Sequence, residues 1–134
     1  YEFQPILEEK GLTCRLVAMD DMMLNCDADK MQRVFDNLLR NAVVYSYGQT
    51  EIAIEAGRDE SEITVQFSNR GGTIPKEKLE RIFEQFYRLD TGRGTDGAGL
   101  GLAIAKQIVT LHKGIIEAES ENNLTVFTVT LPVL

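Results

Sequence analysis

Apolar residues between positions 27 and 46 recur every three or four residues, which is the spacing of an amphipathic helix. This apolar stripe consists of Met31, Val34, Phe35, Leu38, Leu39 and Ala42. Asn37 and Asn41 flank the stripe four residues apart, so both amides are expected on one face of the helix. The pattern predicts a helix over residues 27–46 that buries one side and carries two amides at the edge of that side.

Two later helices are predicted from the same kind of spacing. The first begins at Pro75, because proline is tolerated in the first turn of a helix, and runs to about Phe86. Its expected buried residues are Leu79, Ile82, Phe83 and Phe86. The second covers residues 100–112 and ends before Gly114, a residue type that commonly terminates helices.

Short segments that alternate polar and apolar residues predict strands. The five predicted strands are residues 13–19, 51–56, 62–68, 115–120 and 124–131, and residues 69–73 are expected to form a turn. Strands that follow one another favour antiparallel pairing, with helices packed on one face. We therefore predict an α+β fold, a two-layer α/β sandwich. Its mixed, mainly antiparallel sheet has about five strands and carries three main helices on one face.

Composition narrows the classes of function. The 134 residues suffice for one domain with a substantial core. A net charge of −7 and the lack of a run of Lys and Arg argue against nucleic acid as the main partner. Cys14 and Cys26 fit no metal-ligand spacing and are expected to be reduced and packed, which favours a cytosolic compartment.

A glycine-rich segment opens the third predicted helix. It reads Gly97-Ala98-Gly99-Leu100-Gly101-Leu102. Backbone N–H groups at the start of a helix bind phosphate, and the amide oxygens of Asn37 and Asn41 suit Mg²⁺. The chain has no G-x-x-x-x-G-K-[ST] motif, and the spacing of these glycines differs from that of a dinucleotide-binding loop. Together, the glycines and the amides predict a magnesium–nucleotide site.

Four segments, in this order, resemble the sequence boxes of sensor histidine kinases. Residues 36–42 (DNLLRNA) resemble the N box, and residues 69–75 (NRGGTIP) resemble the G1 box. Residues 82–88 (IFEQFYR) look like the F box, and residues 97–104 (GAGLGLAI) look like the G2 box. The combination of four boxes is highly specific. In detail, the residues of these boxes are similar to those of the vancomycin-resistance sensor kinases.

This resemblance implies the Bergerat ATP-binding fold of the GHKL proteins, which include the gyrase- and MutL-like ATPases. It implies Mg²⁺ at Asn41, and it places Asn37 and Arg88 near the phosphates as catalytic residues. The polar loop before the G2 box is expected to enclose the triphosphate. The ATP-binding residues implied by the resemblance are Asn37, Asn41, Tyr45, Asn69, Gly71, Thr73, Ile74, Arg88, Gly97, Ala98, Gly99, Leu100, Gly101 and Leu102.

The resemblance also implies that the γ-phosphoryl group of ATP is transferred to a histidine on a separate dimerisation domain, which then serves a response regulator. Residues 1–12 would be the linker from the dimerisation and phosphoacceptor helices, and residues 13–134 would be the catalytic domain. The isolated chain is expected to be a monomer that cannot phosphorylate itself, and the cytoplasmic part of a membrane sensor. Similarity to the vancomycin-resistance kinases associates the chain with glycopeptide resistance.

Asn37 favours a kinase over a hydrolase. In gyrase-like relatives a glutamate at the corresponding position activates water, whereas an amide cannot accept a proton at neutral pH. Transfer to a histidine needs less help, because a neutral imidazole is already nucleophilic. An ATPase or a serine kinase on the same fold is the first alternative, and it would need another acceptor or a water-activating base.

Three residues depart from the family pattern. Asn69 stands where most relatives carry an aspartate, Thr73 replaces a glycine, and Val44 stands where many relatives carry a lysine. One of Arg88, Arg93 and Lys106 is expected to supply the missing charge, and the sequence leaves the three as alternatives. These departures favour a second alternative, a nucleotide-poor pseudokinase that acts as a protein-interaction module.

We expect an Asn69→Asp variant to bind ATP about tenfold more tightly than the wild type. A neutral hydrogen bond to the adenine amine contributes about 1 kcal/mol, and a charged one contributes roughly 1.5–3 kcal/mol. A difference of about 1.4 kcal/mol corresponds to one factor of ten in affinity. Calorimetric titration of both proteins with ATP measures this difference. Equal affinities would mean that residue 69 does not limit nucleotide binding.

Overall fold

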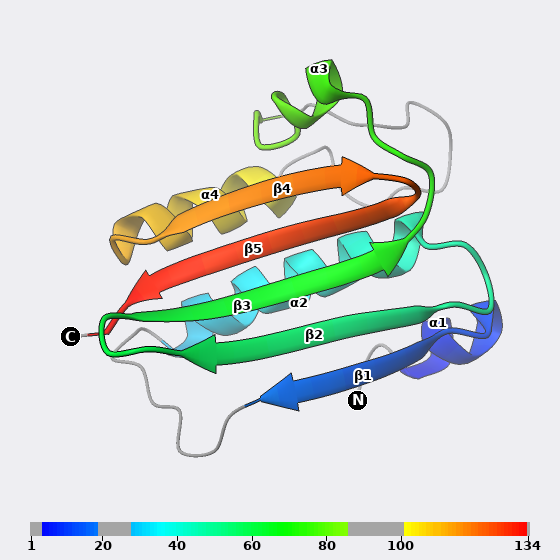
Figure 1. The fold of residues 1–134 in the computed structure, drawn as a ribbon, viewed down its shortest axis with the longest axis horizontal. Helices are drawn as coiled ribbons and strands as arrows, with labels where there is room; N and C mark the ends of the chain where they lie inside the picture. Colours follow the sequence, from blue (N-terminus) through cyan, green and yellow to red (C-terminus); the bar gives the residue numbers. More distant parts are fainter. Residues whose placement is uncertain (1–3, 19–27, 86–100, 134) are drawn as a thin grey trace.

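Five strands form one open sheet in this computed structural model, which describes residues 4–18, 28–85 and 101–133 (Figure 1). The strands are β1 (Thr13–Ala18), β2 (Glu51–Arg58), β3 (Glu62–Arg70), β4 (Ile115–Glu121) and β5 (Leu124–Pro132). Their order in the sheet is β1-β2-β3-β5-β4. β1 and β2 are parallel, and the other neighbours are antiparallel. The predicted α+β class with a mixed, mainly antiparallel sheet is confirmed.

Two long helices, α2 (Ala28–Tyr45) and α4 (Gly101–Leu111), pack together on one face of the sheet. They lie behind the strands in Figure 1. The short helix α1 (Gln4–Lys10) lies where β1 and β2 begin, and the four-residue helix α3 (Lys76–Leu79) contacts β4. α2 connects β1 to β2, which explains their parallel pairing, since parallel neighbours need a long crossover. None of the described helices is long and apolar enough to cross a membrane.

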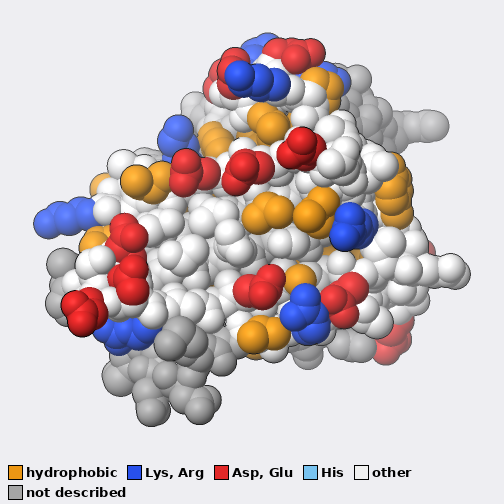
Figure 2. Space-filling model, viewed as in Figure 1, with side chains coloured by type: hydrophobic (Ala, Val, Ile, Leu, Met, Phe, Trp, Pro, Cys, Tyr) orange, Lys and Arg blue, Asp and Glu red, His pale blue; other side chains and the backbone are white. Residues whose placement is uncertain are grey.

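The core lies between the sheet and the two long helices. The predicted stripe of α2 faces it, with Val34 and Leu38 both 0% exposed. From the sheet, Phe67 of β3 pairs with Phe127 of β5, and both side chains are buried. Burial of each such side chain contributes roughly 1.5–3 kcal/mol. The opposite face of the sheet, turned toward the viewer in Figure 2, carries dispersed acidic and basic side chains.

The helix α1 is fixed to the C-terminal end of α2. Leu7 of α1 is buried in the core. The ammonium group of Lys10 donates hydrogen bonds to the carbonyl oxygens of Val43, at 2.7 Å, and of Ser46, at 3.0 Å. Carbonyl groups at the end of a helix lack intrahelical partners, so these bonds satisfy them. This segment therefore packs as part of the folded unit, and its link to dimerisation helices stays a prediction.

The predicted length of the second helix is wrong, because α3 ends at Leu79 instead of near Phe86. Beyond Leu79 the chain makes tight turns. The N–H of Arg81 donates to the carbonyl oxygen of Lys78, and the N–H of Glu84 donates to that of Arg81, both at 2.9 Å. Such bonds span three residues, so they preserve an apolar spacing of three without a helix. Phe86 itself lies outside the described residues.

The apolar residues of this segment still face inward. Ile82 is 2% exposed, and Leu79 and Phe83 are half-buried against the core. The ring of Phe83 meets that of Phe127 edge-on, with centroids 6.1 Å apart and an angle of 87° between the rings. The prediction of burial is therefore confirmed for these residues, although the prediction of a helix is not.

Two further local predictions are wrong. Asn69 is predicted in a turn, but it lies in β3 opposite Thr125, because the ladder with β5 continues to the end of both strands. Cys14 is predicted to be packed, but it is exposed, because β1 is an edge strand. Partial burial, together with the charge of Glu51, raises the pKa of the Cys14 thiol. Cys26 lies outside the described residues.

α4 ends in a Schellman motif. The N–H of Gly114 donates to the carbonyl oxygen of Val109, and the N–H of Lys113 donates to that of Thr110, both at 2.9 Å. Lys113 has a φ of 63°, the left-handed conformation that usually belongs to glycine at this position. Gly114 is needed for a different reason, since a Cβ there would lie 2.5 Å from the carbonyl oxygen of Thr130.

We expect Lys113→Gly to raise the free energy of unfolding by about 0.5–1 kcal/mol, because glycine adopts the left-handed conformation without steric cost. Gly114→Ala should lower it by roughly 1–3 kcal/mol, because the added methyl group overpacks the contact with β5. Urea denaturation of both variants and the wild type measures the two changes. A destabilised Lys113→Gly variant would contradict this account of the helix end.

Candidate functional site

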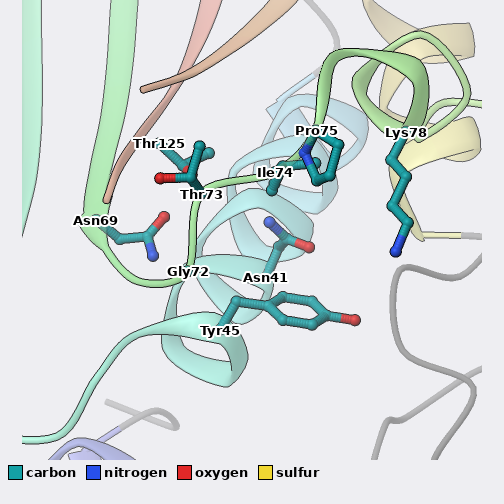
Figure 3. A pocket seen from close by; sticks show the side chains of 9 residues that line it. All are labelled: Asn41, Tyr45, Asn69, Gly72, Thr73, Ile74, Pro75, Lys78 and Thr125. Atoms are coloured by element: carbon teal, nitrogen blue, oxygen red, sulfur yellow. The ribbon is translucent and has the colours of Figure 1, made fainter. Parts of the chain in front are cut away.

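A cavity of about 380 Å³ lies between α2, the ends of β3 and β5, and α3 (Figure 3). Its volume lies in the range of small-molecule sites, roughly 300–1,000 Å³. The residues that line it are Asn41, Tyr45, Asn69, Gly72, Thr73, Ile74, Pro75, Lys78 and Thr125. Those that the sequence predicted as ATP-binding are Asn41, Tyr45, Asn69, Thr73 and Ile74. The structure thus brings together residues of the N box and the G1 box.

One edge of α2 supplies a wall of the site. Asn37, Asn41 and Tyr45 follow one another at intervals of four residues, so they lie along the same helix face. Asn41 and Tyr45 are half-buried and line the cavity. Asn37, one turn earlier, donates from Nδ2 to the carbonyl oxygen of Gly101 at 3.1 Å. This bond ties α2 to the first turn of α4, where backbone N–H groups suit an anion.

The floor of the cavity is polar, buried and uncharged. Asn69 and Thr125 are paired across β3 and β5, and each is 3% exposed. The hydroxyl of Thr125 lies 2.9 Å from the hydroxyl of Ser120. No described residue forms a hydrogen bond with the side-chain amide of Asn69. Buried amides usually have a hydrogen-bond partner. Because this amide has none among the described residues, its donor and acceptor are available to a ligand.

Gly71 allows the chain to leave β3 beside the end of α2. A Cβ at this position would collide with the carbonyl oxygen of Tyr45, so any larger residue would push β3 and α2 apart. The N–H of Tyr47 donates to the carbonyl oxygen of Arg70 at 2.8 Å, and Ser46 forms a bridge with Gly71. Gly71 does not line the cavity itself, but it sets the distance between the two walls that do.

The rim of the cavity is fixed to the last residues of β4 and to the turn that follows them. The Thr73 hydroxyl accepts a hydrogen bond from the N–H of Asn123 at 2.8 Å, and the N–H of Ile74 donates to the Ser120 hydroxyl at 2.8 Å. Thr73 replaces the last glycine of the family pattern, and these contacts give its side chain a structural role.

Four lining residues were not predicted from the sequence, namely Gly72, Pro75, Lys78 and Thr125, and Lys78 is the charged one. Among the described residues that line the cavity, it alone carries a formal charge. Figure 3 shows it across the cavity from Asn69 and Thr125, with Asn41 and Tyr45 between them. Lys78 lies one helical turn after Pro75, the predicted start of the helix, so its place beside the G1 box could have been read from the sequence. Thr125, by contrast, reaches the site through strand pairing, which local spacing does not reveal.

Of the other predicted charges, Lys106 alone lies in the described residues, and it is not at this cavity. The Nζ of Lys106 lies 5.6 Å from the centroid of the Phe83 ring, and Lys106 does not line the cavity. Lys106 was one candidate for the charge that Val44 does not supply, and the side chain of Val44 is 37% exposed. Leu102 and Gly101 lie in α4 and also do not line the cavity. Predicted residues outside the described ranges are Arg88, Arg93, Gly97, Ala98, Gly99 and Leu100, and the roles of all predicted site residues stay predictions.

The open mixed sheet, the helices on one face and the polar cavity at the edge of α2 define an α/β sandwich with a cavity of ligand size. The family described as histidine kinase-, DNA gyrase B-, and HSP90-like ATPase matches residues 26–134. The chain therefore belongs to this family, and the resemblance of its four boxes is confirmed.

The chain is also similar to part of known sensor proteins and to solved catalytic domains of histidine kinases. The sensor protein VanS of Enterococcus faecium is 47% identical over 135 residues, which cover 99% of this chain and 35% of VanS. The chain thus spans about a third of the length of that relative. The catalytic domain of histidine kinase ThkA superposes with a TM-score of 0.87 at 28% identity, covering 98% of this chain and 85% of that one. ThkA in complex with the response regulator TrrA shows the same fold, with a TM-score of 0.83 at 24% identity over 99% of this chain and 37% of that one.

We expect Lys78→Met to weaken ATP binding about threefold to tenfold, because an ammonium group near phosphates at an exposed site contributes about 1 kcal/mol. The loss should shrink as salt is added, since salt screens exposed charges. Lys76→Met is the matched control, because Lys76 is exposed in the same helix and does not line the cavity. Calorimetric titration at low and high salt measures both variants, and equal losses in the two would contradict a specific role for Lys78.

Proposed function

We propose that this chain is the catalytic ATP-binding domain of a sensor histidine kinase. In this proposal it binds Mg-ATP and passes the γ-phosphoryl group to a histidine on a separate dimerisation domain. The observation that carries the proposal is the cavity that Asn41 and Tyr45 of α2 line together with the buried amide of Asn69. Membership of the ATPase family and 47% identity to the sensor protein VanS support it.

The base of ATP would lie at the floor of the cavity. Asn69 offers a carbonyl oxygen that can accept from the adenine amine, and its burial strengthens such a bond. Tyr45 is half-buried and lines the same cavity, where an aromatic face can pack on a purine. These contacts fix the orientation of the nucleotide.

The phosphates would extend along α2 toward the start of α4. The amide oxygen of Asn41 is a neutral ligand that suits Mg²⁺, which otherwise keeps waters and phosphate oxygens in its shell. Asn37 lies one turn away and is held by its bond to Gly101. When bound, Mg²⁺ supplies neutralisation of the phosphate charge. Phosphoryl transfer depends mainly on such positioning and charge neutralisation.

The kind of phosphoryl acceptor that we propose follows from residue 37, which is not a proton-accepting side chain. Asn37 cannot take a proton from water, so transfer to a nucleophilic histidine is favoured over hydrolysis. That histidine would belong to the dimerisation domain of the same kinase, and the phosphoryl group would pass on to a response regulator, as the ThkA–TrrA complex suggests. By analogy with VanS, the whole protein would be a membrane sensor connected with glycopeptide resistance.

We expect ATP and ADP to bind this chain in a magnesium-dependent manner and Asn41→Ala to abolish the effect of magnesium. The reason is that Asn41 supplies the amide oxygen for the ion, whereas the base contacts do not depend on it. Calorimetric titration with and without Mg²⁺ measures both. Gln32→Ala, an exposed substitution on the same helix, is the control. Absence of binding at millimolar nucleotide would overturn the proposal and favour the pseudokinase alternative.

A further inference from the structure

The amide of Asn69 is the most distinctive group in the cavity. It is 3% exposed, lies near the end of β3 opposite Thr125 of β5, and forms no hydrogen bond with any described residue. It also lines the cavity, as Figure 3 shows. From this geometry we propose that Asn69 lets the site accept 6-oxopurine nucleotides as well as ATP. This inference rests on the proposed function and concerns the base that the same site selects.

The chemical reason is that an amide presents both a donor and an acceptor, whereas an ionised carboxylate presents only acceptors. Adenine carries a donating amine at position 6, and guanine carries an accepting oxygen there. A carboxylate can pair with the amine but faces the oxygen with its own negative charge. An amide pairs with the amine through Oδ1, and after rotation of its terminal group it pairs with the oxygen through Nδ2.

The surroundings of Asn69 leave this choice open. No described side chain holds its amide in one orientation by a hydrogen bond. Thr125, which pairs with Asn69 across β3 and β5 and also lines the cavity, carries a hydroxyl that can itself donate or accept. The one charged residue among the described lining residues, Lys78, lies on the other side of the cavity. The floor therefore imposes no charge that would favour one purine edge over the other.

The test compares ADP with inosine diphosphate, whose base carries an oxygen in place of the amine at position 6. Both are titrated calorimetrically, with Mg²⁺, into the wild type, Asn69→Asp and Gln66→Glu. Gln66 is the matched control, because the same amide-to-carboxylate change is made in the same strand. Its side chain is exposed, three residues away and so on the opposite face of the sheet.

In the wild type, the Kd values of the two nucleotides are expected to lie within about tenfold of each other. Asn69→Asp should raise the ratio of inosine diphosphate Kd to ADP Kd by at least about tenfold, because the oxygen then faces an acceptor in a buried site. Gln66→Glu should leave that ratio unchanged.

Wild-type protein that binds ADP but not inosine diphosphate would overturn the inference and leave the proposed function standing. Protein that binds neither nucleotide would overturn both. An unchanged ratio in Asn69→Asp would show that another residue selects the base. If Asn69→Asp does not fold, the comparison of the two nucleotides on the wild type decides the question.

Discussion

The site depends on the rotation of α2 about its own axis, which the burial of its apolar stripe fixes. Val34 and Leu38 are fully buried, so Asn37, Asn41 and Tyr45 must lie at the edge of the helix. A shift by one residue would turn the helix by about 100° and carry the amides into the core. A buried amide without a partner costs about 1–3 kcal/mol, so the polar and apolar positions enforce the same orientation.

The C-terminal end of α2 also fixes the geometry of the site, because three parts of the chain meet there. The ammonium of Lys10 binds carbonyl oxygens of Val43 and Ser46, and Gly71 passes against the carbonyl group of Tyr45. The same turn of α2 thus contacts the segment before β1 and the exit from β3. The last turn of α2 is therefore the part of the structure that connects α1 to the wall of the cavity.

The sequence predicted the parts of the site that lie on one element, and missed those that depend on contacts between elements. Asn41 was found because helical spacing reports burial directly, and the strands were found by alternation. Asn69 was recognised as a site residue, but its residue type favours a turn, and only pairing with Thr125 keeps it in β3. Thr125 and Lys78 were missed, since register and the path of a short helix are properties of the folded chain. The length of α3 was wrong because a spacing of three residues fits tight turns as well as helices.

The charge at the cavity also depends on packing some distance away. Lys78 lies on a four-residue helix, and helices of that length are not stable alone. The segment that follows is held by buried Ile82 and by the ring of Phe83, which meets Phe127 of β5 edge-on and carries the ammonium of Lys106 over its face. These contacts join α3, α4 and the sheet. Because Asn69 is neutral, the charge that Lys78 brings to the described lining of the cavity depends on the packing that positions α3.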